Sequence, residues 1–520
     1  MRVLFASSEI YPLAKTGGLA DVSAALPIAL TGLGVDVRLV MPGYPEALDS
    51  AADLKVAAQC NDSGAPTRVL SGRLPDSGLP VWLVDCPALF NRGGGLYQNA
   101  QGDDWRDNHQ RFSLLSHIAA KIAAGEVVAD WRADVVHAND WHTGLIPLLL
   151  ENNGEARPAT LFTMHNLAFQ GLFAADALSE IGLPEGLFTP EGLEFHGRIS
   201  FLKAGIRYSD RCNTVSPAYA REILTPEFGC GLDGLLNERA GHLSGILNGI
   251  DCAVWNPASD PYLPARFDAH DMSGKHKCKA DLQRALGLEV EPQTPLVIWA
   301  SRLAHQKMVD TALQMLPELL TTREVQFALI GEGEPAFERG FAELAQAYPD
   351  RMAVRIGYEE ALAHRFYAAG DILLHPSRFE PCGLTPQYAM RYGTIPVVTS
   401  VGGLTDTVRD ANEQAMRAGT ATGFSFAEQT APAMLACLDR ALAAYARPVT
   451  WRRLQRQAMS QDCGWQASAA RYLALYRELA PFAPQVEGEA PLQPAVVEAE
   501  DIAATSPGPS ATTTWRRAAP

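Results

Sequence analysis

The 520-residue sequence contains no apolar run long enough to cross a bilayer, which takes roughly 18 to 20 residues in a helix. Its first residues enter a strand-like segment at 3–6 directly, without the apolar stretch and small-residue cleavage site of a signal peptide. We therefore expect a cytoplasmic protein with no membrane partner.

Disulfide and zinc frameworks are also missing. The nine cysteines are odd in number, are spread over the chain and never form a C-x-x-C pair. Scattered cysteines of this kind are typical of reduced thiols.

No D-x-D carboxylate pair follows a predicted strand, since Asp103 and Asp104 lie in a glycine-rich loop. We therefore predict no metal, no cofactor and catalysis without a divalent ion.

Basic residues are in the minority, with 43 Lys and Arg against 59 Asp and Glu and a formal charge of −16. A field of that sign repels nucleic-acid backbones and anionic lipids, so neither is expected as a partner. An anionic ligand would need a local basic pocket. Hydrophobic residues still make up 47% of the chain, which is enough for ordered cores, and the length favours more than one domain.

Short apolar runs bounded by Gly, Pro, Asn or Asp alternate with amphipathic stretches, as in buried parallel strands and crossover helices. The alternation breaks at the Asn- and Pro-rich segment Asn248–Pro264, a candidate hinge, and then restarts. We predict an α/β protein with two doubly wound, Rossmann-like domains, 1–250 and 251–455, facing across a cleft. Residues 485–520, rich in Pro, Ala, Glu, Ser and Thr, are predicted to form a disordered tail. Strands are predicted at 3–6, 35–41, 134–138, 160–164 and 212–215, and at 296–300, 326–330, 352–356, 372–374 and 395–398.

The loop Lys15–Val22 follows the first predicted strand and contains Gly17 and Gly18 at the start of a helix. Backbone N–H groups there can approach a phosphate or a sugar closely, with Lys15 as a nearby cation. The alternative is a glycine loop that only turns the chain.

Two further loops of the first domain carry polar side chains. His165 and Asn166 follow the strand 160–164, and Asp140 and His142 follow the strand 134–138. Such side chains at the ends of adjacent strands can hydrogen-bond sugar hydroxyls. A single histidine there would more often be structural, but two such loops in one sheet favour a sugar site.

In the second domain, Arg302 and Lys307 follow the strand 296–300. Two fixed cations at a strand end suit a diphosphate, although an ordinary surface pair is the alternative. The segment Ser377–Thr385 follows the strand 372–374, where Glu380 can hold sugar hydroxyls and the N–H groups near Gly383 can face an anion.

One stretch resembles a dinucleotide fingerprint. Residues Gly331–Ala336 fit G-x-G-x-x-A after a strand, and Glu359 follows the next strand, so NAD binding is a rival reading. Glu332 and Glu334 would repel a pyrophosphate, and Pro335 occupies the opening of the helix. These features disfavour the dinucleotide interpretation.

The motifs K-T-G-G-L-A-D-V, H-N-L-A-F-Q-G, S-R-L-x-x-Q-K and E-P-C-G-L-T together resemble those of bacterial glycogen synthases and plant starch synthases. The likeness runs from residue 1 to about residue 480 in order and spacing. It implies the GT-B fold, a helix at 456–480 that crosses back to the first domain, and retaining transfer of glucose from a nucleotide-glucose, ADP-glucose, to the non-reducing end of an α-1,4-glucan. The expected partners are thus a sugar nucleotide and a polysaccharide.

The resemblance also implies roles for individual residues. It places the catalytic groups at His165, Arg302, Lys307 and Glu380, the donor-binding groups at Lys15, Gly17, Gly18, Asn166, Asn248, Tyr358, Cys382, Gly383, Leu384 and Thr385, and the acceptor-binding groups at Tyr97, Asp140 and His142.

The chain departs from the family pattern at two positions. Met308 stands where the family commonly has a glycine after the phosphate-binding lysine, which restricts the backbone beside Lys307. Tyr388, eight residues beyond Glu380, stands where the broader GT-B pattern has a second glutamate.

Retention of configuration is compatible with same-face attack or with a covalent intermediate. Either route needs the site to close and exclude water. The rival functions are a sugar-nucleotide 2-epimerase, a pyridoxal-dependent glucan phosphorylase and a catalytically inactive glucan-binding module.

Overall fold

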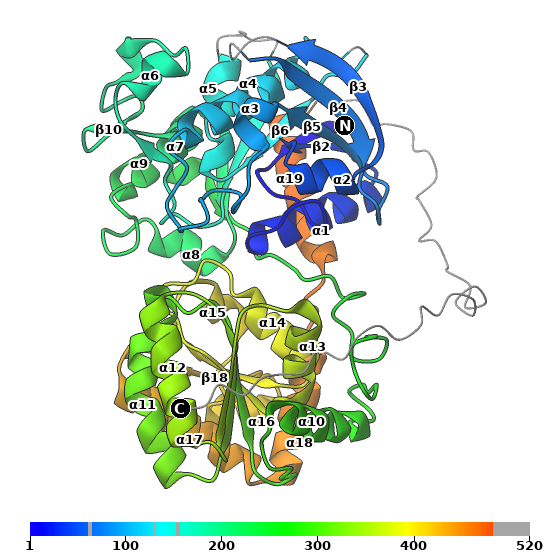
Figure 1. The fold of residues 1–520 in the computed structure, drawn as a ribbon, viewed down its shortest axis with the longest axis vertical. Helices are drawn as coiled ribbons and strands as arrows, with labels where there is room; N and C mark the ends of the chain where they lie inside the picture. The colour runs from blue at the N-terminus through cyan, green and yellow to red at the C-terminus, as the bar shows by residue number, and fades with distance from the viewer. Residues whose placement is uncertain (61–64, 129, 152–156, 482–520) are drawn as a thin grey trace, which may run out of the picture. The chain divides into compact units, whose positions relative to one another are not determined.

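The computed structural model describes residues 1–60, 65–128, 130–151 and 157–481 (Figure 1). The predicted tail 485–520 lies outside them. The first domain is built on a nine-stranded sheet of order β12-β11-β7-β6-β1-β2-β5-β4-β3, parallel from β12 to β5 and antiparallel from β5 to β3. Its strands are β1 (Arg2–Ala6), β2 (Asp36–Pro42), β3 (Ala52–Cys60), β4 (Thr67–Arg73), β5 (Pro80–Asp85), β6 (Val135–Asn139), β7 (Ala159–Met164), β11 (Arg211–Thr214) and β12 (Leu243–Gly245).

A small antiparallel sheet of order β8-β10-β9 is inserted between β7 and β11. It consists of β8 (Leu172–Phe173), β9 (Glu194–Phe195) and β10 (Arg198–Ser200). The helices of the first domain are α1 (Gly18–Gly32), α2 (Pro45–Ser50), α3 (Pro87–Phe90), α4 (Asn108–Ala124), α5 (Ile146–Glu151), α6 (Ala177–Glu180), α7 (Phe201–Tyr208), α8 (Pro217–Glu222), α9 (Asp233–Glu238) and α19 (Trp465–Leu479), with short 3₁₀ turns at Trp141–Thr143, Glu185–Leu187 and Ala240–His242.

The second domain contains a six-stranded parallel sheet of order β15-β14-β13-β16-β17-β18. Its strands are β13 (Leu296–Ala300), β14 (Gln326–Gly331), β15 (Met352–Ile356), β16 (Ile372–His375), β17 (Ile395–Thr399) and β18 (Phe424–Phe426). Its helices are α10 (Ser273–Leu286), α11 (Val309–Thr322), α12 (Pro335–Ala347), α13 (Glu360–Ala369), α14 (Leu384–Arg391), α15 (Gly402–Thr407), α16 (Glu413–Ala418), α17 (Ala431–Tyr445) and α18 (Pro448–Met459), with a 3₁₀ turn at His305–Lys307.

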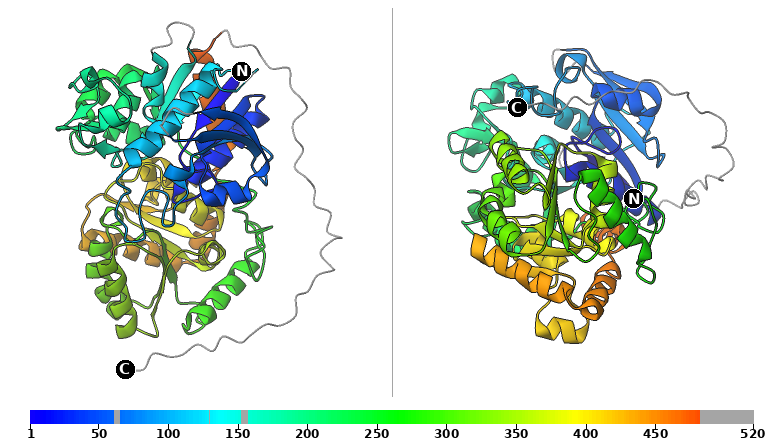
Figure 2. Two further views of the ribbon diagram at one scale, coloured as in Figure 1. Left: turned by 45° about the horizontal axis from the view of Figure 1, so that its top comes forward. Right: turned by 60° about the horizontal axis from the view of Figure 1, so that its bottom comes forward.

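Helices cover both faces of this second sheet (Figure 2). Alternate residues of β13 therefore enter different cores: Val297 and Trp299 pack in one hydrophobic cluster, and Leu296 and Ile298 in the other. Because both faces are buried, the strand is a continuous apolar run rather than an alternating one. This run is the signal that made the strand predictable.

The predicted fold class is confirmed, and the strands 296–300 and 352–356 have the predicted bounds. The segment Asn248–Pro264 contains neither helix nor strand, as expected. The prediction did not include β3, β4 or β5. Most side chains of β3 are exposed, because it is an antiparallel edge strand, so it lacks the apolar run of a buried strand.

The segment Trp451–Leu479, which has helical spacing, forms two helices rather than one. Trp451 of α18 packs in a core of the second domain, whereas Trp465 of α19 packs in the core of the first. Two tyrosines fix α19 there, with the Tyr476 hydroxyl 2.7 Å from Nδ1 of His137 and the Tyr472 hydroxyl 3.0 Å from the Asn213 amide. The helix that returns to the first domain thus begins at Trp465.

Over the described residues, no helix combines the length and apolarity needed to cross a membrane.

Candidate functional site

The predicted loops follow neighbouring strands from which the chain continues toward opposite edges of the sheet. In the first sheet β1 and β6 are neighbours, and the chain continues to β2 on one side and to β7 on the other. β13 and β16 hold the same place in the second sheet. Such a point leaves a crevice at the carboxyl ends of the strands, where doubly wound sheets bind ligands. The loops that follow these four strands carry Lys15–Gly18, Asp140 and His142, Arg302 and Lys307, and Glu380–Thr385.

A buried glutamate that the sequence analysis missed organises the first loop. Glu9 is 4% exposed, and one of its oxygens accepts the backbone N–H groups of Thr16 and Gly17. Its other oxygen accepts the hydroxyl of Tyr97 at 3.0 Å. Burial raises the pKa of Glu9, and the two backbone hydrogen bonds offset part of that rise. Because these two amides are taken, an anion at this loop would meet backbone amides from Gly18 onward.

Lys15 and Gly18 flank this loop. The Lys15 ammonium donates to Asp21 at 2.8 Å, which holds the cation beside the first turn of α1. A Cβ atom on Gly18 would lie 3.4 Å from a methyl group of Leu384 on α14. The structure therefore brings the predicted donor residues of the first domain next to one from the second.

The predicted acceptor residues Tyr97 and His142 stack, with ring centroids 4.5 Å apart. The Tyr97 hydroxyl also lies 2.7 Å from Oγ of Ser8. His142 is 5% exposed, yet neither ring nitrogen has a hydrogen-bond partner among the described residues. Burial lowers the pKa of His142 well below its ordinary value. The neutral ring has one donor and one acceptor nitrogen, and both are buried.

Asp140, a predicted acceptor residue, contacts the loop that carries His165 and Asn166. Its carboxylate accepts the backbone N–H of His165 at 2.7 Å, and it has a left-handed φ of 57°. A non-glycine residue in that region costs about 1 to 2 kcal/mol, which is typical of functional loops. Burial raises the pKa of Asp140 to about 7, against the hydrogen bonds from the His165 and Asn166 amides.

The protonation of His165 follows from its neighbour Asn139. The Asn139 amide donates to the carbonyl of Ala6 at 3.0 Å, so its oxygen faces the ring. That oxygen lies 3.0 Å from Nε2 of His165, which therefore carries the proton and leaves Nδ1 as an acceptor. Burial lowers the pKa of His165 to about 3. The side chain is thus suited to accept a hydrogen bond from a hydroxyl, and Asn166 follows it with its own oxygen 3.1 Å from the Ala168 amide.

Lys307 and Glu380 form a buried ion pair at the corresponding point of the second sheet. The Lys307 ammonium donates to Oε2 of Glu380, which also accepts the Ser377 hydroxyl at 2.9 Å. Nε2 of His375 lies 3.5 Å from the same oxygen. Burial by itself would raise the pKa of Glu380, but the Lys307 charge reverses this and holds the pKa below its usual range. Arg302 lies on the same loop as Lys307 and is exposed. It has no ion-pair partner among the described residues.

Met308 explains the departure from the family pattern. It has a φ of 53° at the junction with α11, and its side chain is fully buried in the second domain. Glycine reaches this φ freely, so the position has the backbone that the family glycine would supply. In this chain the buried side chain compensates for the strain, and Lys307 keeps a defined backbone.

The loop after Glu380 is shaped by Gly383, whose φ is 81° and whose added Cβ would lie 2.7 Å from Leu404. Cys382 accepts the Asn248 backbone N–H, and burial raises the pKa of its thiol to about 12, so it is no nucleophile at neutral pH. The Asn248 side-chain oxygen is buried without a partner among the described residues. Thr385 lies on the first turn of α14, where its side chain interacts with Tyr367.

Tyr358, the predicted nucleobase contact, and Tyr388, at the position of the second GT-B glutamate, differ in exposure. Tyr358 is 57% exposed after β15, which leaves its ring available to stack on a base. Tyr388 instead stacks on Trp255 with centroids 4.0 Å apart and is buried. The position of the second family glutamate is therefore part of an aromatic core.

The glycines at 402 and at 331 and 333 allow neighbouring loops to pack closely. Gly402 donates its N–H to Glu222 at 2.7 Å, and an added Cβ there would lie 2.1 Å from the Glu380 carbonyl oxygen. In the dinucleotide-like stretch, Cβ atoms on Gly331 and Gly333 would collide with the backbone of the loop after β13. These glycines seat the loops that carry Glu380 and Arg302, which accounts for the fingerprint without a dinucleotide.

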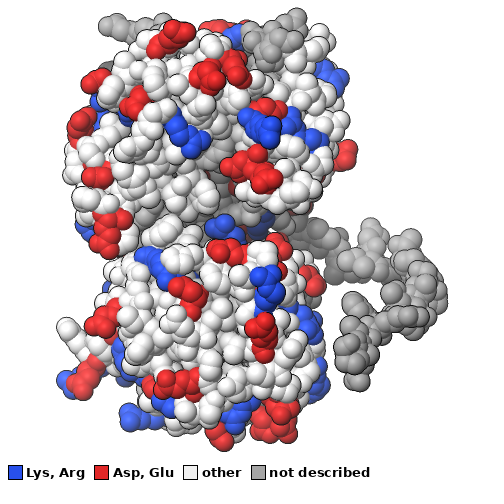
Figure 3. All heavy atoms as spheres, turned by 60° about the vertical axis from the view of Figure 1, so that its left-hand side comes forward, with Lys and Arg blue, Asp and Glu red and all other residues white. Residues whose placement is uncertain are grey.

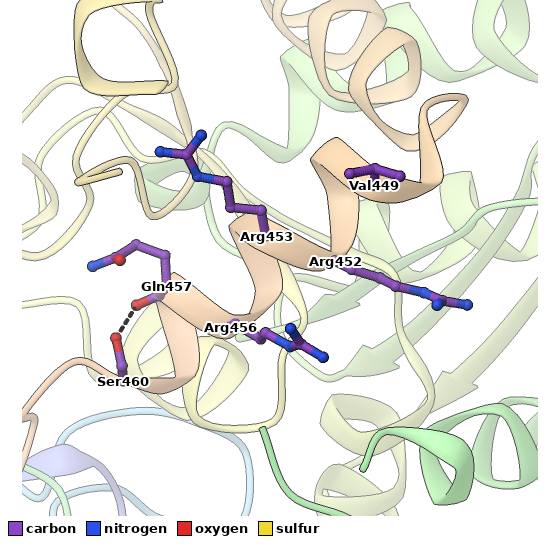
Figure 4. A pocket seen from close by; sticks show the side chains of 6 residues that line it. All are labelled: Val449, Arg452, Arg453, Arg456, Gln457 and Ser460. Carbon is purple, nitrogen blue, oxygen red and sulfur yellow. Dashed lines mark hydrogen bonds between the residues drawn. The ribbon is translucent and has the colours of Figure 1, made fainter. Parts of the chain in front are cut away.

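Other surface features lie apart from these loops. A cavity of about 610 Å³ lies along α18 and contains no predicted site residue (Figure 4). On the face drawn in Figure 3, basic and acidic side chains of the described residues are interspersed. No group of three or more His, Cys, Asp or Glu residues in the described ranges is arranged to hold a metal ion. The cavity is lined by Val449, Arg452, Arg453, Arg456, Gln457 and Ser460.

Comparison with known protein families divides the chain into the same two parts. The starch synthase catalytic domain matches residues 2–238, and glycosyl transferases group 1 matches residues 294–443. A glycogen synthase of Burkholderia thailandensis is 54% identical over 92% of this chain and 90% of its own length. One from Thioalkalivibrio sulfidiphilus is 50% identical over 92% of this chain and all of its own.

Solved structures agree. The catalytic domain of starch synthase IV from Arabidopsis thaliana, bound to ADP and acarbose, matches with a TM-score of 0.83 and 33% identity over 92% of this chain and 99% of that one. Sucrose-phosphate synthase from Thermosynechococcus elongatus, at 18% identity and a TM-score of 0.57 over 93% and 100%, shares the fold. By these relatives and by the loops described above, the chain belongs to the glycogen and starch synthase family of GT-B glycosyltransferases.

Proposed function

We propose that this protein transfers glucose from ADP-glucose to the non-reducing end of an α-1,4-glucan, with retention of configuration and without a metal ion or other cofactor. The buried Lys307–Glu380 pair carries the proposal, because it sets a fixed cation at the strand end where a diphosphate would leave. In this scheme residues 1–250 form the glucan acceptor side, with Lys15, Gly18 and Asn166 also reaching the donor, and residues 251–455 form the donor side. We also propose a cytoplasmic location, which suits cysteines that are scattered along the chain and never form a C-x-x-C pair.

The donor side of the proposal rests on charge. Breaking the anomeric C–O bond places negative charge on the departing diphosphate, which Lys307, Arg302 and the amides near Gly383 would stabilise. Each preorganised group of this kind is worth about 10²- to 10³-fold in rate. The Arabidopsis relative is bound to ADP, which supports an adenine nucleotide, and Tyr358 offers an exposed ring for its base.

The sugar side rests on hydrogen-bonding side chains. His165 offers a lone pair at Nδ1 for a glucose hydroxyl, and Glu380 and Asn166 would hold others. Tyr97, Asp140 and His142 would contact the acceptor glucan. The carboxylates Glu9, Asp140 and Glu380 are each hydrogen-bonded already, which favours same-face attack over a covalent carboxylate intermediate. The leaving phosphate would then take the proton of the acceptor hydroxyl.

Turnover of ADP-glucose and UDP-glucose, each with glycogen as acceptor, tests the proposal. We expect glucan elongation with ADP-glucose at a kcat/KM far above that with UDP-glucose. Isomerisation of the sugar nucleotide without transfer would point to an epimerase, and phosphorolysis with a visible pyridoxal absorption would point to a phosphorylase. Binding of glycogen with neither donor consumed would identify an inactive binding module and overturn the proposal.

A further inference from the structure

The chain passes twice between the hydrophobic cores of the two domains, and the two crossings touch. The first runs from Ile246 in the first core to Ile250 in the second, and the second runs from Met459 at the end of α18 to Trp465 of α19. The Ile250 N–H donates to the carbonyl of Cys463 at 2.8 Å.

Further contacts hold the crossings together. A Cβ atom on Gly249 would lie 2.7 Å from the carbonyl carbon of Gly464, so the backbones are as close as glycine allows. The Ser468 hydroxyl of α19 also donates to the carbonyl of Leu247. The two segments therefore form one paired joint, Leu247–Cys252 with Gln461–Trp465, which we call the hinge pair.

Each half of the hinge pair carries one cysteine, Cys252 and Cys463. Both are free and partly exposed, and they lie close enough for each thiol to shift the pKa of the other. Five of the other cysteines are buried. The hinge pair thus brings two accessible thiols together at the one place where the chain changes domains.

The charges around the two thiols separate their roles. The hydrogen bond from Cys463, followed by the nearby Arg391 guanidinium, lowers the pKa of Cys252 to about 7 against burial, Asp251 and Asp462. The same hydrogen bond raises the pKa of Cys463 above its ordinary value. The opposite shifts make Cys252 the more readily ionised thiol, which attacks, while Cys463 keeps its proton beside it as a resolving thiol.

We propose that Cys252 and Cys463 form a reversible disulfide, by exchange with a low-molecular-weight disulfide, that ties the two chain crossings together. The Cys252 thiolate attacks one sulfur of the small disulfide, and the other sulfur leaves as a thiolate. Cys463 then loses its proton to that thiolate or to water and attacks the mixed disulfide at Cys252. The bond to the small molecule breaks, and a second small thiol is released. Two protein thiols are oxidised, and one small disulfide is reduced to two thiols.

The tie would restrict movement of one domain against the other. Residues of the proposed site come from both domains, with His165 on the first and Lys307 on the second, so their approach depends on the hinge pair. We expect the oxidised protein to have a kcat several-fold lower than the reduced protein. This consequence rests on the proposed transferase function, whereas formation of the bond does not.

The full-length protein incubated with oxidised glutathione, followed by intact-mass and peptide mass spectrometry, tests the bond. We expect loss of two hydrogens, a linked peptide pair containing Cys252 and Cys463, and reversal by dithiothreitol. The rate should rise with pH through about 7, as the Cys252 thiolate fraction increases. Cys463→Ser should trap one glutathionyl group on Cys252, and Cys252→Ser should leave Cys463 largely unmodified.

Cys230→Ser is the matched control, because Cys230 is exposed and lies outside the hinge pair, and this variant should form the linked peptide as the unaltered protein does. Cys252→Ala provides a second variant if the serine disturbs the joint. Absence of the linked peptide, or equal reaction in Cys252→Ser, would overturn the disulfide. A complete disulfide with unchanged kcat would overturn the restriction of movement, and absent transferase activity in the reduced protein would count against the proposed function alone.

Discussion

Buried carboxylates in the two halves of the proposed site have pKa values shifted in opposite directions. In the first domain, burial raises the pKa values of Glu9 and Asp140 and keeps His165 neutral, because hydrogen bonds alone support these groups. In the second domain, equal burial leaves Glu380 ionised, because the Lys307 ammonium lies against it. The first, which we call the hydrogen-bonded half, suits sugar hydroxyls, and the second, which we call the charged half, suits a diphosphate. The difference therefore follows the chemistry of the proposed substrates.

Removing the cation from the charged half should have the largest effect. Lys307→Met should lower kcat about 10²- to 10³-fold and destabilise the fold by about 3 to 5 kcal/mol, because Glu380 is left buried and unpaired. Steady-state turnover and denaturant unfolding measure the two effects. Lys277→Met, on the exposed side of α10, is the control. A double variant that adds Glu380→Gln should recover stability without recovering turnover, and recovery of both would contradict the role of Lys307.

Removing the Glu9 carboxylate from the hydrogen-bonded half should lower activity by displacing the loop that it holds. Glu9→Ala leaves the Thr16 and Gly17 amides without their acceptor and the Tyr97 hydroxyl with Ser8 alone, and each unsatisfied amide costs about 1 to 3 kcal/mol. We expect kcat/KM for the donor to fall more than about tenfold. Glu9→Gln keeps an acceptor oxygen and should recover much of the loss. Equal activity of the alanine variant and the unaltered protein would show that the loop holds its shape without Glu9.

Asp140 should give the first domain a pH-dependent stability of defined sign. Its pKa is raised from 3.8 to about 7 in the folded state, so the folded protein binds this proton more tightly than the unfolded chain. Ionised Asp140 therefore lowers the free energy of unfolding by up to about 4 kcal/mol above pH 7. This loss disappears as the pH falls from 7 to 4 and the carboxyl takes up its proton. The difference in unfolding free energy between Asp140→Asn and the unaltered protein should change over that window. A constant difference would show that the carboxyl is ionised throughout.

Met308 should affect stability more than chemistry. Met308→Gly removes the left-handed strain of about 1 to 2 kcal/mol but empties a buried site, which costs about 2 to 5 kcal/mol. We expect a net loss of about 1 to 3 kcal/mol in thermal or denaturant unfolding, with KM for the donor changed less than about threefold. Met315→Ala, buried in the same core away from Lys307, is the control. A large selective rise in KM would show that Met308 positions Lys307 in a way glycine does not.

Metal removal should have no effect. If Lys307 and Arg302 neutralise the leaving group, turnover after exhaustive chelation should equal turnover before it. The measurement is the initial rate of glucose transfer with and without chelator. A loss restored by Mg²⁺ would contradict a charged half made only of protein groups.

The sequence alone located most of the parallel strands and the loops that follow them, because parallel strands buried on both faces are apolar runs and ligand loops follow their carboxyl ends. It also identified the four motifs that place the chain in its family. These are local properties, carried by residues adjacent in the chain.

The tertiary structure decided what these residues contact. The pairing of Lys307 with Glu380, across 73 residues, and the capture of the Gly17 loop by Glu9 depend on which strands become neighbours. The left-handed backbone at Met308 and the meeting of Cys252 with Cys463 depend on packing against distant segments. A lone carboxylate, thiol or methionine carries no local pattern, and burial and charge act on it only once the sheets and crossings are assembled.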